Sequence, residues 1–275
     1  MQERAPLADL RRRYAGEIIA AAHPRSARVE EAFATVPREE FLTPPPWRVF
    51  APGGLVEKIT SDPADLYDDV LVVLDGAQGI NNGQPSLHAA WISAIDPRPG
   101  ETAIHIGIGT GYYTAILATL VGGEGRVHAY EIDQPLAALA RERLARFPNT
   151  TVHATSGVAA ALPKADVIDV NAGATAPDPG WLRALKPKGR LVFPWQLDRG
   201  SAVTMLVERR PKGFRAKPTF GVGFIPCIGA QGERSDRRAG GDPSETRSVW
   251  LSAARKPDDT AIAVYEEVWF SSDPV

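Results

Sequence analysis

The chain has 275 residues, of which 44% are hydrophobic and 23% charged, and its formal net charge is −2. These values are ordinary for a globular protein, and the length is sufficient for a full-size core. Because the net charge is slightly negative, no global positive field exists to attract nucleic acid or an anionic membrane. The N-terminus has no signal-peptide pattern, and no stretch approaches the roughly 18 apolar residues of a membrane helix. We therefore expect a cytoplasmic protein that binds neither nucleic acid nor membranes.

Metal-ligating residue types are sparse in this chain. Cys227 is the single cysteine, which excludes an internal disulfide and any multi-cysteine metal site. His23, His128 and His153 lack the spacing of metal ligands. The sequence therefore predicts no metal site.

The N-terminal part of the chain is expected to combine helices with irregular chain. Apolar residues recur at helical spacing over residues 7–35, which predicts helices there. Residues 47–84 follow a run of three prolines and are expected to be mostly irregular, with short strands around residues 70–74. A second apolar stripe predicts a helix over residues 85–95.

Predicted strands and helices alternate after residue 100. Short apolar runs predict the strands, and amphipathic runs predict helices between them. The expected strands are 102–106, 126–131, 151–154, 167–170 and 191–193, and the expected helices are 112–121 and 133–147. This alternation indicates right-handed βαβ units and a parallel sheet.

The C-terminal part changes to strands without intervening helices, over residues 202–208, 220–225 and 262–270. Residues 229–248 are rich in Gly, Arg, Asp and Ser and are expected to form a mobile loop. The predicted fold is therefore α/β: a doubly wound, mostly parallel sheet with N-terminal helices and antiparallel C-terminal strands. We expect three segments: an N-terminal helical and cap segment (1–84), an α/β core with added strands (85–230) and a C-terminal loop and strand extension (231–275).

A glycine-rich run lies where the first core strand ends and the next helix begins. It reads His105-Ile106-Gly107-Ile108-Gly109-Thr110-Gly111-Tyr112. Glycines let a nucleotide approach the backbone closely, and the helix N-terminus offers free amides. Because Tyr112 replaces the third glycine of the GxGxxG dinucleotide pattern, NAD binding is disfavoured.

Glu131 ends the second core strand, 24 residues after Gly107. In a doubly wound fold, this position carries the carboxylate that accepts hydrogen bonds from ribose hydroxyls. Each feature alone has a simpler interpretation, a tight turn for the glycines and a solvated strand end for Glu131. Together they predict a nucleoside-binding site.

Several segments carry motifs that occur together in one enzyme family. They are Val36-Pro37-Arg38 with Phe41, Gly83-Gln84-Pro85 through Ala89, Ile106 to Tyr112, Arg126 to Ile132, and Leu185-Lys186-Pro187 through Leu191. In this order they resemble the VPRxxF, SxPxxxA, IGTGSGY, VYSVEI and LKPGGRL motifs of the protein-L-isoaspartate O-methyltransferases. The resemblance covers about residues 5–230.

This resemblance implies a class I methyltransferase-like Rossmann fold that binds S-adenosylmethionine. It also implies an enzyme that methylates the carboxylate of isoaspartyl or related peptides and proteins. Asn171 is added to the expected site because it ends the fourth core strand, where ligands bind in doubly wound sheets. The residues expected to bind the cofactor are His105, Gly107, Gly109, Thr110, Gly111, Tyr112, Glu131, Ile132, Ser156, Gly157 and Asn171.

Three positions depart from the family pattern. His105 stands where the family has an acidic residue, and Thr155-Ser156-Gly157 stands where it has a GDG turn. Gly83 aligns with the loop serine that the family places beside the substrate carboxylate. Two alternatives therefore stay open: a methyltransferase for a different small-molecule or peptide acceptor, and a catalytically silent binding protein on the same fold. The oligomeric state is not evident from the sequence.

Methyl transfer to a carboxylate needs alignment more than a strong base, because the nucleophile is already ionised. Hydrogen-bond donors beside that carboxylate are therefore the candidate catalytic groups. The candidates are Asn81, Asn82, Gly83 and Ser86. A simple turn at Asn82-Gly83 and a first-turn helix position for Ser86 are the structural alternatives. Because Gly83 lacks the hydroxyl of the family's serine, Gly83→Ser is expected to raise methylation.

Overall fold

The computed structural model describes residues 6–51, 57–198, 201–230 and 242–275. The chain divides into two compact units, which we describe separately. The first unit comprises residues up to 101 together with 108–154, and the second comprises 102–107 together with 155–275. No helix within the described ranges is long and apolar enough to cross a membrane.

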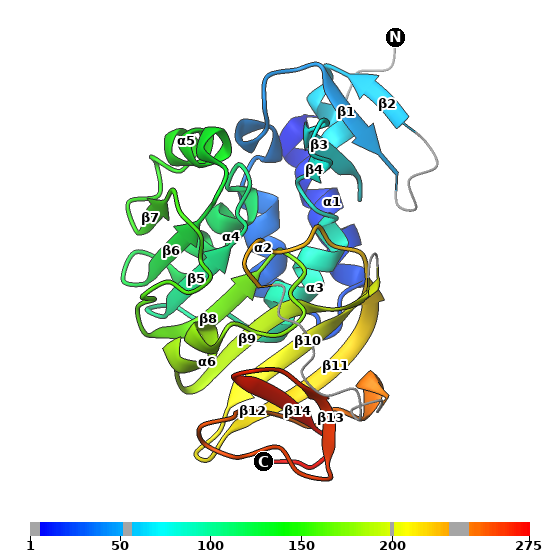
Figure 1. Ribbon diagram of the computed structural model, residues 1–275. Coiled ribbons are helices and arrows are strands. Elements are labelled where there is room, and N and C mark those ends of the chain that lie inside the picture. Colours follow the sequence, from blue (N-terminus) through cyan, green and yellow to red (C-terminus); the bar gives the residue numbers. More distant parts are fainter. Residues whose placement is uncertain (1–5, 52–56, 199–200, 231–241) are drawn as a thin grey trace. The chain divides into compact units, whose positions relative to one another are not determined.

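The first unit contains helices, a small antiparallel sheet and a parallel strand pair (Figure 1). The small sheet has the strand order β2-β1-β3-β4, and β6 pairs with β7 in parallel. The helices are α1 (Leu7–Ala20), α2 (Ala27–Thr35), α3 (Pro85–Ile95), α4 (Tyr112–Val121) and α5 (Gln134–Arg143), with 3₁₀ turns η1 (Arg38–Phe41) and η2 (Pro63–Leu66). The strands are β1 (Trp47–Phe50), β2 (Glu57–Thr60), β3 (Leu71–Asp75), β4 (Ile80–Asn81), β6 (Arg126–Tyr130) and β7 (Thr150–His153).

Local signals in the sequence explain where these helices begin and end. The side chain of Ser26 accepts a hydrogen bond from a backbone N–H in the first turn of α2. The side chain of Asp133 does the same for α5. Helix α4 ends at Gly122, whose φ of 66° lies in the region that favours glycine. The helices that hydrophobic periodicity predicts are therefore present, within a few residues of their expected ends.

The expectation that residues 47–84 are mostly irregular is wrong. Four strands form an antiparallel sheet in this segment. Strands β1 and β2 have four residues each, and three of the four residues in β2 are exposed, so the alternation that identifies a strand is weak. The sheet is held by a core cluster of Leu42, Trp47, Val49, Leu66, Val70 and Val72.

A buried arginine connects η1 to the chain around β3 and β4. Arg38 is fully buried. Its guanidinium donates hydrogen bonds to the carbonyl oxygens of Leu66 at 2.7 Å and Val70 at 2.6 Å, and to Asn82 Oδ1 at 3.2 Å. A buried cation is tolerated only when such acceptors replace water. The planar guanidinium of Arg38 therefore connects η1 with the chain from Leu66 to Val70 and with the chain at Asn82.

Replacing Arg38 with lysine tests this role, because lysine keeps the charge but cannot present the planar fork of donors. We expect Arg38→Lys to lower the free energy of unfolding by about 3 kcal/mol, since buried acceptors lose their partners. Urea denaturation followed by circular dichroism measures the change. Arg12→Lys, at an exposed position of α1, is the control and should match wild type. Equal stability of all three proteins would show that Arg38 is not structurally important.

The second unit is built on a sheet with the strand order β13-β14-β12-β11-β10-β9-β8-β5. Neighbouring strands are parallel from β5 through β8 to β9, and antiparallel from β9 to β13. The elements are β5 (Thr102–Ile106), β8 (Ala165–Val170), α6 (Pro179–Ala184), β9 (Leu185–Asp198), β10 (Ser201–Arg209), β11 (Phe214–Val222), η3 (Pro243–Glu245), β12 (Ser248–Leu251), β13 (Ala261–Val264) and β14 (Val268–Ser271). The predicted antiparallel C-terminal strands are therefore present.

Details of the C-terminal region differ from the sequence prediction. Residues 262–270 form two strands, because the chain turns where Tyr265 N–H bonds to Val268 O at 2.9 Å. Strand β11 begins at Phe214, before the expected strand over 220–225, and helix α6 was not expected. Of the loop predicted over 229–248, residues 231–241 lie outside the described residues. The proposed three-segment division stays a prediction.

Candidate active site

The carboxylate of Glu131 is oriented by two backbone amides in the first unit. Gly109 N–H donates to Oε2 at 2.7 Å, and Asp133 N–H donates to Oε1 at 3.1 Å. Glu131 is only 7% exposed, and burial raises the pKa of its carboxyl. Each oxygen still has a lone pair for a further donor. This carboxylate can therefore accept hydrogen bonds from two hydroxyl groups of a ligand. The adjacent Ile132 is 44% exposed and presents an apolar surface.

Two glycines of the loop before α4 have a positive φ and little room for a side chain. Gly109 has a φ of 54°, and an added Cβ would approach Leu74 Cδ1 to 3.1 Å. Gly111 has a φ of 95°, and its Cβ would meet Leu144 Cδ1 at 2.9 Å. A side chain at Gly109 would therefore crowd Leu74, whereas a side chain at Gly111 would crowd Leu144.

The other two loop residues predicted to bind cofactor are both buried. Thr110 is 1% exposed and Tyr112 is 2% exposed. The Tyr112 ring packs edge-on against Phe33 at 6.0 Å and is tilted against Phe41 at 6.0 Å. The structure therefore places Tyr112 in the aromatic core of the first unit.

Removing the carboxylate of Glu131 should weaken cofactor binding without unfolding the chain. We expect Glu131→Ala to raise the dissociation constant of S-adenosylhomocysteine about tenfold or more, because each charge-assisted hydrogen bond contributes roughly 1.5–3 kcal/mol. Isothermal titration calorimetry measures the constant, and circular dichroism verifies the fold. Glu142→Ala, on the exposed surface of α5, is the matched control. Unchanged affinity in Glu131→Ala would exclude Glu131 as a ribose ligand.

Asn82 is the best-oriented amide among the predicted catalytic residues. It is 9% exposed, and its Oδ1 accepts hydrogen bonds from Val72 N–H at 2.9 Å and from Arg38. Its amide nitrogen is buried and has no hydrogen-bond partner among the described residues. A buried donor without an acceptor costs roughly 1–3 kcal/mol. The Asn82 amide is therefore fixed in direction and lacks only an acceptor.

Gly83 has no room for a side chain, which corrects the expectation that Gly83→Ser raises methylation. Its φ is 74°, and an added Cβ would lie 2.1 Å from His88 Nε2. The His88 ring is held in place by stacking on Tyr113, with ring centroids 3.7 Å apart. Histidine therefore occupies the space that a side chain at position 83 would need. The neighbouring Asn81 makes a turn, because its Oδ1 accepts from Gly83 N–H at 2.9 Å.

Ser86 is committed to a structural contact at the start of α3. Its Oγ donates to Asp69 Oδ2 at 2.6 Å, and its backbone N–H donates to Asp69 Oδ1 at 2.8 Å. Gln84 Nε2 donates to the same carboxylate at 2.7 Å. Asp69 therefore caps α3 although it lies outside the helix, because its carboxylate accepts the backbone N–H of Ser86 in the first turn. A negative charge is favourable at this end of a helix. The geometry favours the structural interpretation of Ser86.

The remaining predicted site residues lie in the second unit. His105 is fully buried, and its Nε2 lies 2.5 Å from Asn171 Nδ2. Burial lowers the pKa of His105 to about 3, so this imidazole is neutral and can accept from the amide. Gly107 approaches the backbone of Asn171, where an added Cβ would lie 3.4 Å from the carbonyl oxygen.

Ser156 and Gly157 form a turn in the same unit. Ser156 Oγ accepts from Val158 N–H at 3.0 Å, and Gly157 O accepts from Trp181 Nε1 at 2.8 Å. An added Cβ at Gly157 would meet the Ile106 side chain at 2.8 Å. The structural contacts of this turn are therefore defined, and its role in cofactor binding stays a prediction.

Asp169 is a buried acid that sequence analysis missed. It lies on β8 opposite His105 on β5 and is fully buried. Neither carboxylate oxygen has a hydrogen-bond partner among the described residues. Burial raises the pKa of Asp169 to about 7. The group is therefore partly protonated near neutral pH.

This raised pKa predicts a pH-dependent stability. A carboxyl whose pKa rises from 3.8 to about 7 on folding stabilises the fold below pH 3.8. That contribution is lost as the pH rises through about 7. Asp169→Asn removes the titrating group, so the variant should gain a few kcal/mol over wild type as the pH rises.

Urea unfolding of both proteins at about pH 5 and pH 8 measures this difference, because the two values lie on either side of the raised pKa. Folded His105 is neutral at both values, whereas in the unfolded chain it takes up a proton near pH 5. This contribution is the same in wild type and Asp169→Asn, so it cancels from the difference. An identical pH trend in the two proteins would contradict the assignment.

Sequence reasoning did not identify the residues that support the candidate site. Arg38 was visible as part of a motif, but its distant carbonyl partners were not. Asp69 lies 17 residues before Ser86 in the chain, with no local pattern that links them. The described residues contain no group of three His, Cys, Asp or Glu side chains suited to a metal ion.

Comparison with protein families gives one match that covers most of the chain. The family described as Protein-L-isoaspartate(D-aspartate) O-methyltransferase (PCMT) matches residues 17–232. A protein-L-isoaspartate O-methyltransferase of Methanopyrus kandleri is 35% identical over 219 residues, which cover 76% of this chain and 86% of that protein. The protein of the same name from Ignicoccus hospitalis is 32% identical over 215 residues, which cover 77% and 93%.

Two solved structures share the fold. A protein-L-isoaspartate O-methyltransferase superposes with a TM-score of 0.67 at 24% identity, covering 80% of this chain and 66% of its own. A putative protein-L-isoaspartate O-methyltransferase from Plasmodium falciparum, in complex with S-adenosyl-L-homocysteine, gives a TM-score of 0.63 at 18% identity, covering 79% and 97%. These likenesses confirm the predicted class I methyltransferase fold. Residues 233–275 lie outside the family match.

Proposed function

This chain belongs to the protein-L-isoaspartate(D-aspartate) O-methyltransferase family, and we propose that it methylates the carboxylate of isoaspartyl residues in peptides or proteins. The methyl donor of this family is S-adenosylmethionine. The observation that most supports an active enzyme is the carboxylate of Glu131, which Gly109 and Asp133 orient. A buried carboxylate is costly unless donors satisfy it, and the hydroxyl groups of a bound nucleoside would supply further donors to Glu131.

The first unit supplies the groups that fit the cofactor. When bound, S-adenosylmethionine supplies a methyl group on a sulfonium and leaves as S-adenosylhomocysteine. We assign Glu131 to its ribose hydroxyls, because both carboxylate oxygens retain acceptor capacity. Gly109 keeps the backbone beside this carboxylate free of a side chain. The assignments therefore rest on the acceptor capacity of Glu131 and on the absence of a side chain at Gly109.

We assign Asn82 to the acceptor carboxylate. Arg38 and Val72 N–H occupy the Asn82 oxygen, and among the described residues the amide nitrogen is left as an unused donor. Because this nitrogen is buried, a carboxylate would reach it only if the chain around it opens. A carboxylate bound there would remove the cost of the unpartnered donor. No general base is needed, because a carboxylate oxygen attacks the methyl carbon while the carbon–sulfur bond breaks. Orientation of the two reactants is therefore the main contribution of the protein.

His88 explains how the site differs from the family pattern. Its ring fills the space next to Gly83, where the family has its loop serine. A serine at position 83 would therefore require His88 to move. This difference keeps a specialised peptide or small-molecule acceptor as the alternative function. The cytoplasmic location remains a proposal that the single cysteine supports. The lack of nucleic-acid or membrane partners remains a proposal that the net charge of −2 supports.

A matched pair of substitutions tests the role of Asn82. Asn82→Asp keeps the oxygen that contacts Arg38 but removes the donors and adds a charge that repels the substrate carboxylate. We expect it to lower kcat/KM for an isoaspartyl peptide by about one to two orders of magnitude. Asn81→Asp makes the same charge change but keeps the turn contact to Gly83, so its effect should be several-fold at most.

The assay uses a radiolabelled methyl donor with an isoaspartyl peptide and its normal aspartyl counterpart. Wild type should methylate only the isoaspartyl peptide. Equal activity of wild type and Asn82→Asp would remove Asn82 from the site. If wild type binds S-adenosylhomocysteine but methylates neither peptide, a different acceptor replaces the isoaspartyl proposal. If it does not bind S-adenosylhomocysteine, the chain is a catalytically silent member of the family.

A further inference from the structure

A large basic groove lies in the second unit, among residues that are separate from the proposed active site. Its volume is about 950 Å³. It is lined by the turn between β10 and β11, by β11, by the chain before β12 and by the last residues of the described chain. The lining residues are Arg210, Pro211, Lys212, Arg215, Ala216, Lys217, Pro218, Ser244, Thr246, Arg247, Pro274 and Val275.

Positive charge is concentrated in this groove. Five lining side chains are cationic, and the lining contains no aspartate or glutamate. Arg210 is paired with Glu208 at 2.8 Å. Lys212, Arg215 and Lys217 form no ion pair with any residue in the described ranges. Because the whole chain has a net charge of −2, this local excess is a distinct electropositive region.

The spacing of the cations matches an extended chain. Arg215 and Lys217 are exposed on β11, whereas Phe214 before them and Ala216 between them are buried. Two residues along a strand correspond to about 7 Å. An extended peptide has the same repeat between alternate side chains, so acidic residues at every second position would face these two cations. Arg247, next to the point where β12 pairs with β11, adds a third charge beside this row.

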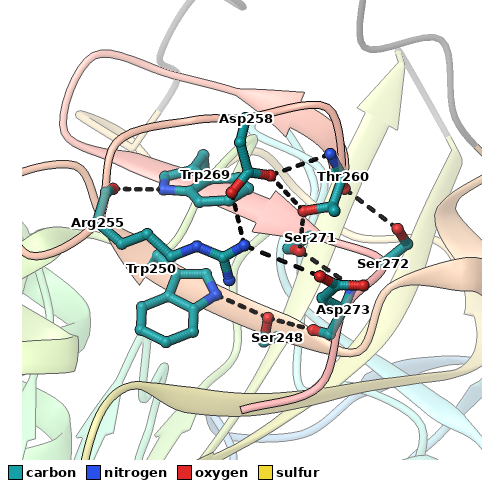
Figure 2. Close-up of polar contacts among 9 residues, drawn as sticks. All are labelled: Ser248, Trp250, Arg255, Asp258, Thr260, Trp269, Ser271, Ser272 and Asp273. Carbon is teal, nitrogen blue, oxygen red and sulfur yellow. Dashed lines mark hydrogen bonds and ion pairs between the residues drawn. The ribbon is translucent and has the colours of Figure 1, made fainter.

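Residues adjacent in the chain to the groove lining form a network of polar contacts around Arg255 (Figure 2). Arg255 lies between the rings of Trp250 and Trp269, at 4.8 and 4.9 Å from their centroids. Ser248 Oγ donates to the carbonyl oxygen of Asp273 at 2.6 Å, and this contact fixes the chain that leads to Pro274 and Val275. A preformed groove binds an extended ligand at a lower entropic cost than a mobile one.

Other anionic ligands fit this groove less well. The volume is near the upper end of ligand pockets, about 300–1,000 Å³, which is far more than an inorganic anion fills. Proteins that bind single-stranded nucleic acid combine cations with aromatic side chains that stack on the bases. The groove lining contains arginine, lysine, proline and small side chains but no aromatic residue.

We propose that this groove is a docking site for an acidic, extended segment of a protein, and that it recruits protein substrates to the methyltransferase. The recruitment step rests on the proposed function, whereas the binding step does not. Attraction between the groove and the segment speeds encounter and falls with salt, because charges are screened beyond about 8 Å at physiological ionic strength. Docking outside the active site would favour proteins with acidic segments over short neutral peptides.

Direct binding tests the groove independently of catalysis. The probe is a fluorescein-labelled peptide of alternating Asp and Ser, with an Asn and Ser peptide as the uncharged control, measured by fluorescence anisotropy in full-length protein. We expect Arg215→Glu with Lys217→Glu to weaken binding of the acidic peptide on the order of tenfold or more, and to reduce its salt dependence. Arg12→Glu with Lys256→Glu makes the same change in net charge at exposed positions outside the groove and should bind like wild type.

Equal binding by wild type and the groove variant would overturn the proposal. Tighter binding of a 20-nucleotide single-stranded DNA, lost in the groove variant, would also overturn it and indicate a nucleic-acid surface instead. Methylation of a short neutral isoaspartyl peptide should be the same in wild type and the groove variant. Loss of acidic-peptide binding with this activity intact supports docking, whereas absence of methylation in wild type concerns the proposed function alone.

Discussion

The burial of one positive charge organises the first unit. Arg38 is inaccessible to solvent, so the chain must bring carbonyl oxygens and an amide oxygen to its guanidinium. This requirement holds the segment around β3 in place and fixes the direction of the Asn82 side chain. The proposed acceptor-binding group is therefore positioned by the same contact that stabilises the fold around it.

Glu131 and His88 show two further ways in which packing determines the chemistry of the site. Backbone amides orient the Glu131 carboxylate before any ligand is present, so binding requires little reorganisation. His88 stacks on Tyr113 and fills the space beside Gly83. A substitution at Gly83 therefore also disturbs His88, so its effect cannot be attributed to position 83 alone.

The sequence was sufficient to predict the core helices, the parallel strands and the glycine loop, because each depends on local periodicity and turn chemistry. It was insufficient for β1 and β2, whose four-residue strands carry too little alternation. It also did not reveal that Asp69 holds Ser86, or that His88 occupies the space beside Gly83. Those contacts depend on tertiary packing between residues that are distant or unpatterned in the chain. The assignment of individual residues to cofactor and acceptor therefore remains a set of predictions.

The strands beyond the family match have a consequence for solubility. Strand β12 pairs with β11, and β14 pairs with β12, so the backbone of the β11 edge is hydrogen-bonded at Phe214 and Arg215. An uncovered edge strand offers its free amides to any other chain and promotes aggregation. Shortening the protein to the length of the family match would remove β12, β13 and β14, including the buried Trp250 and Trp269, and would expose this edge.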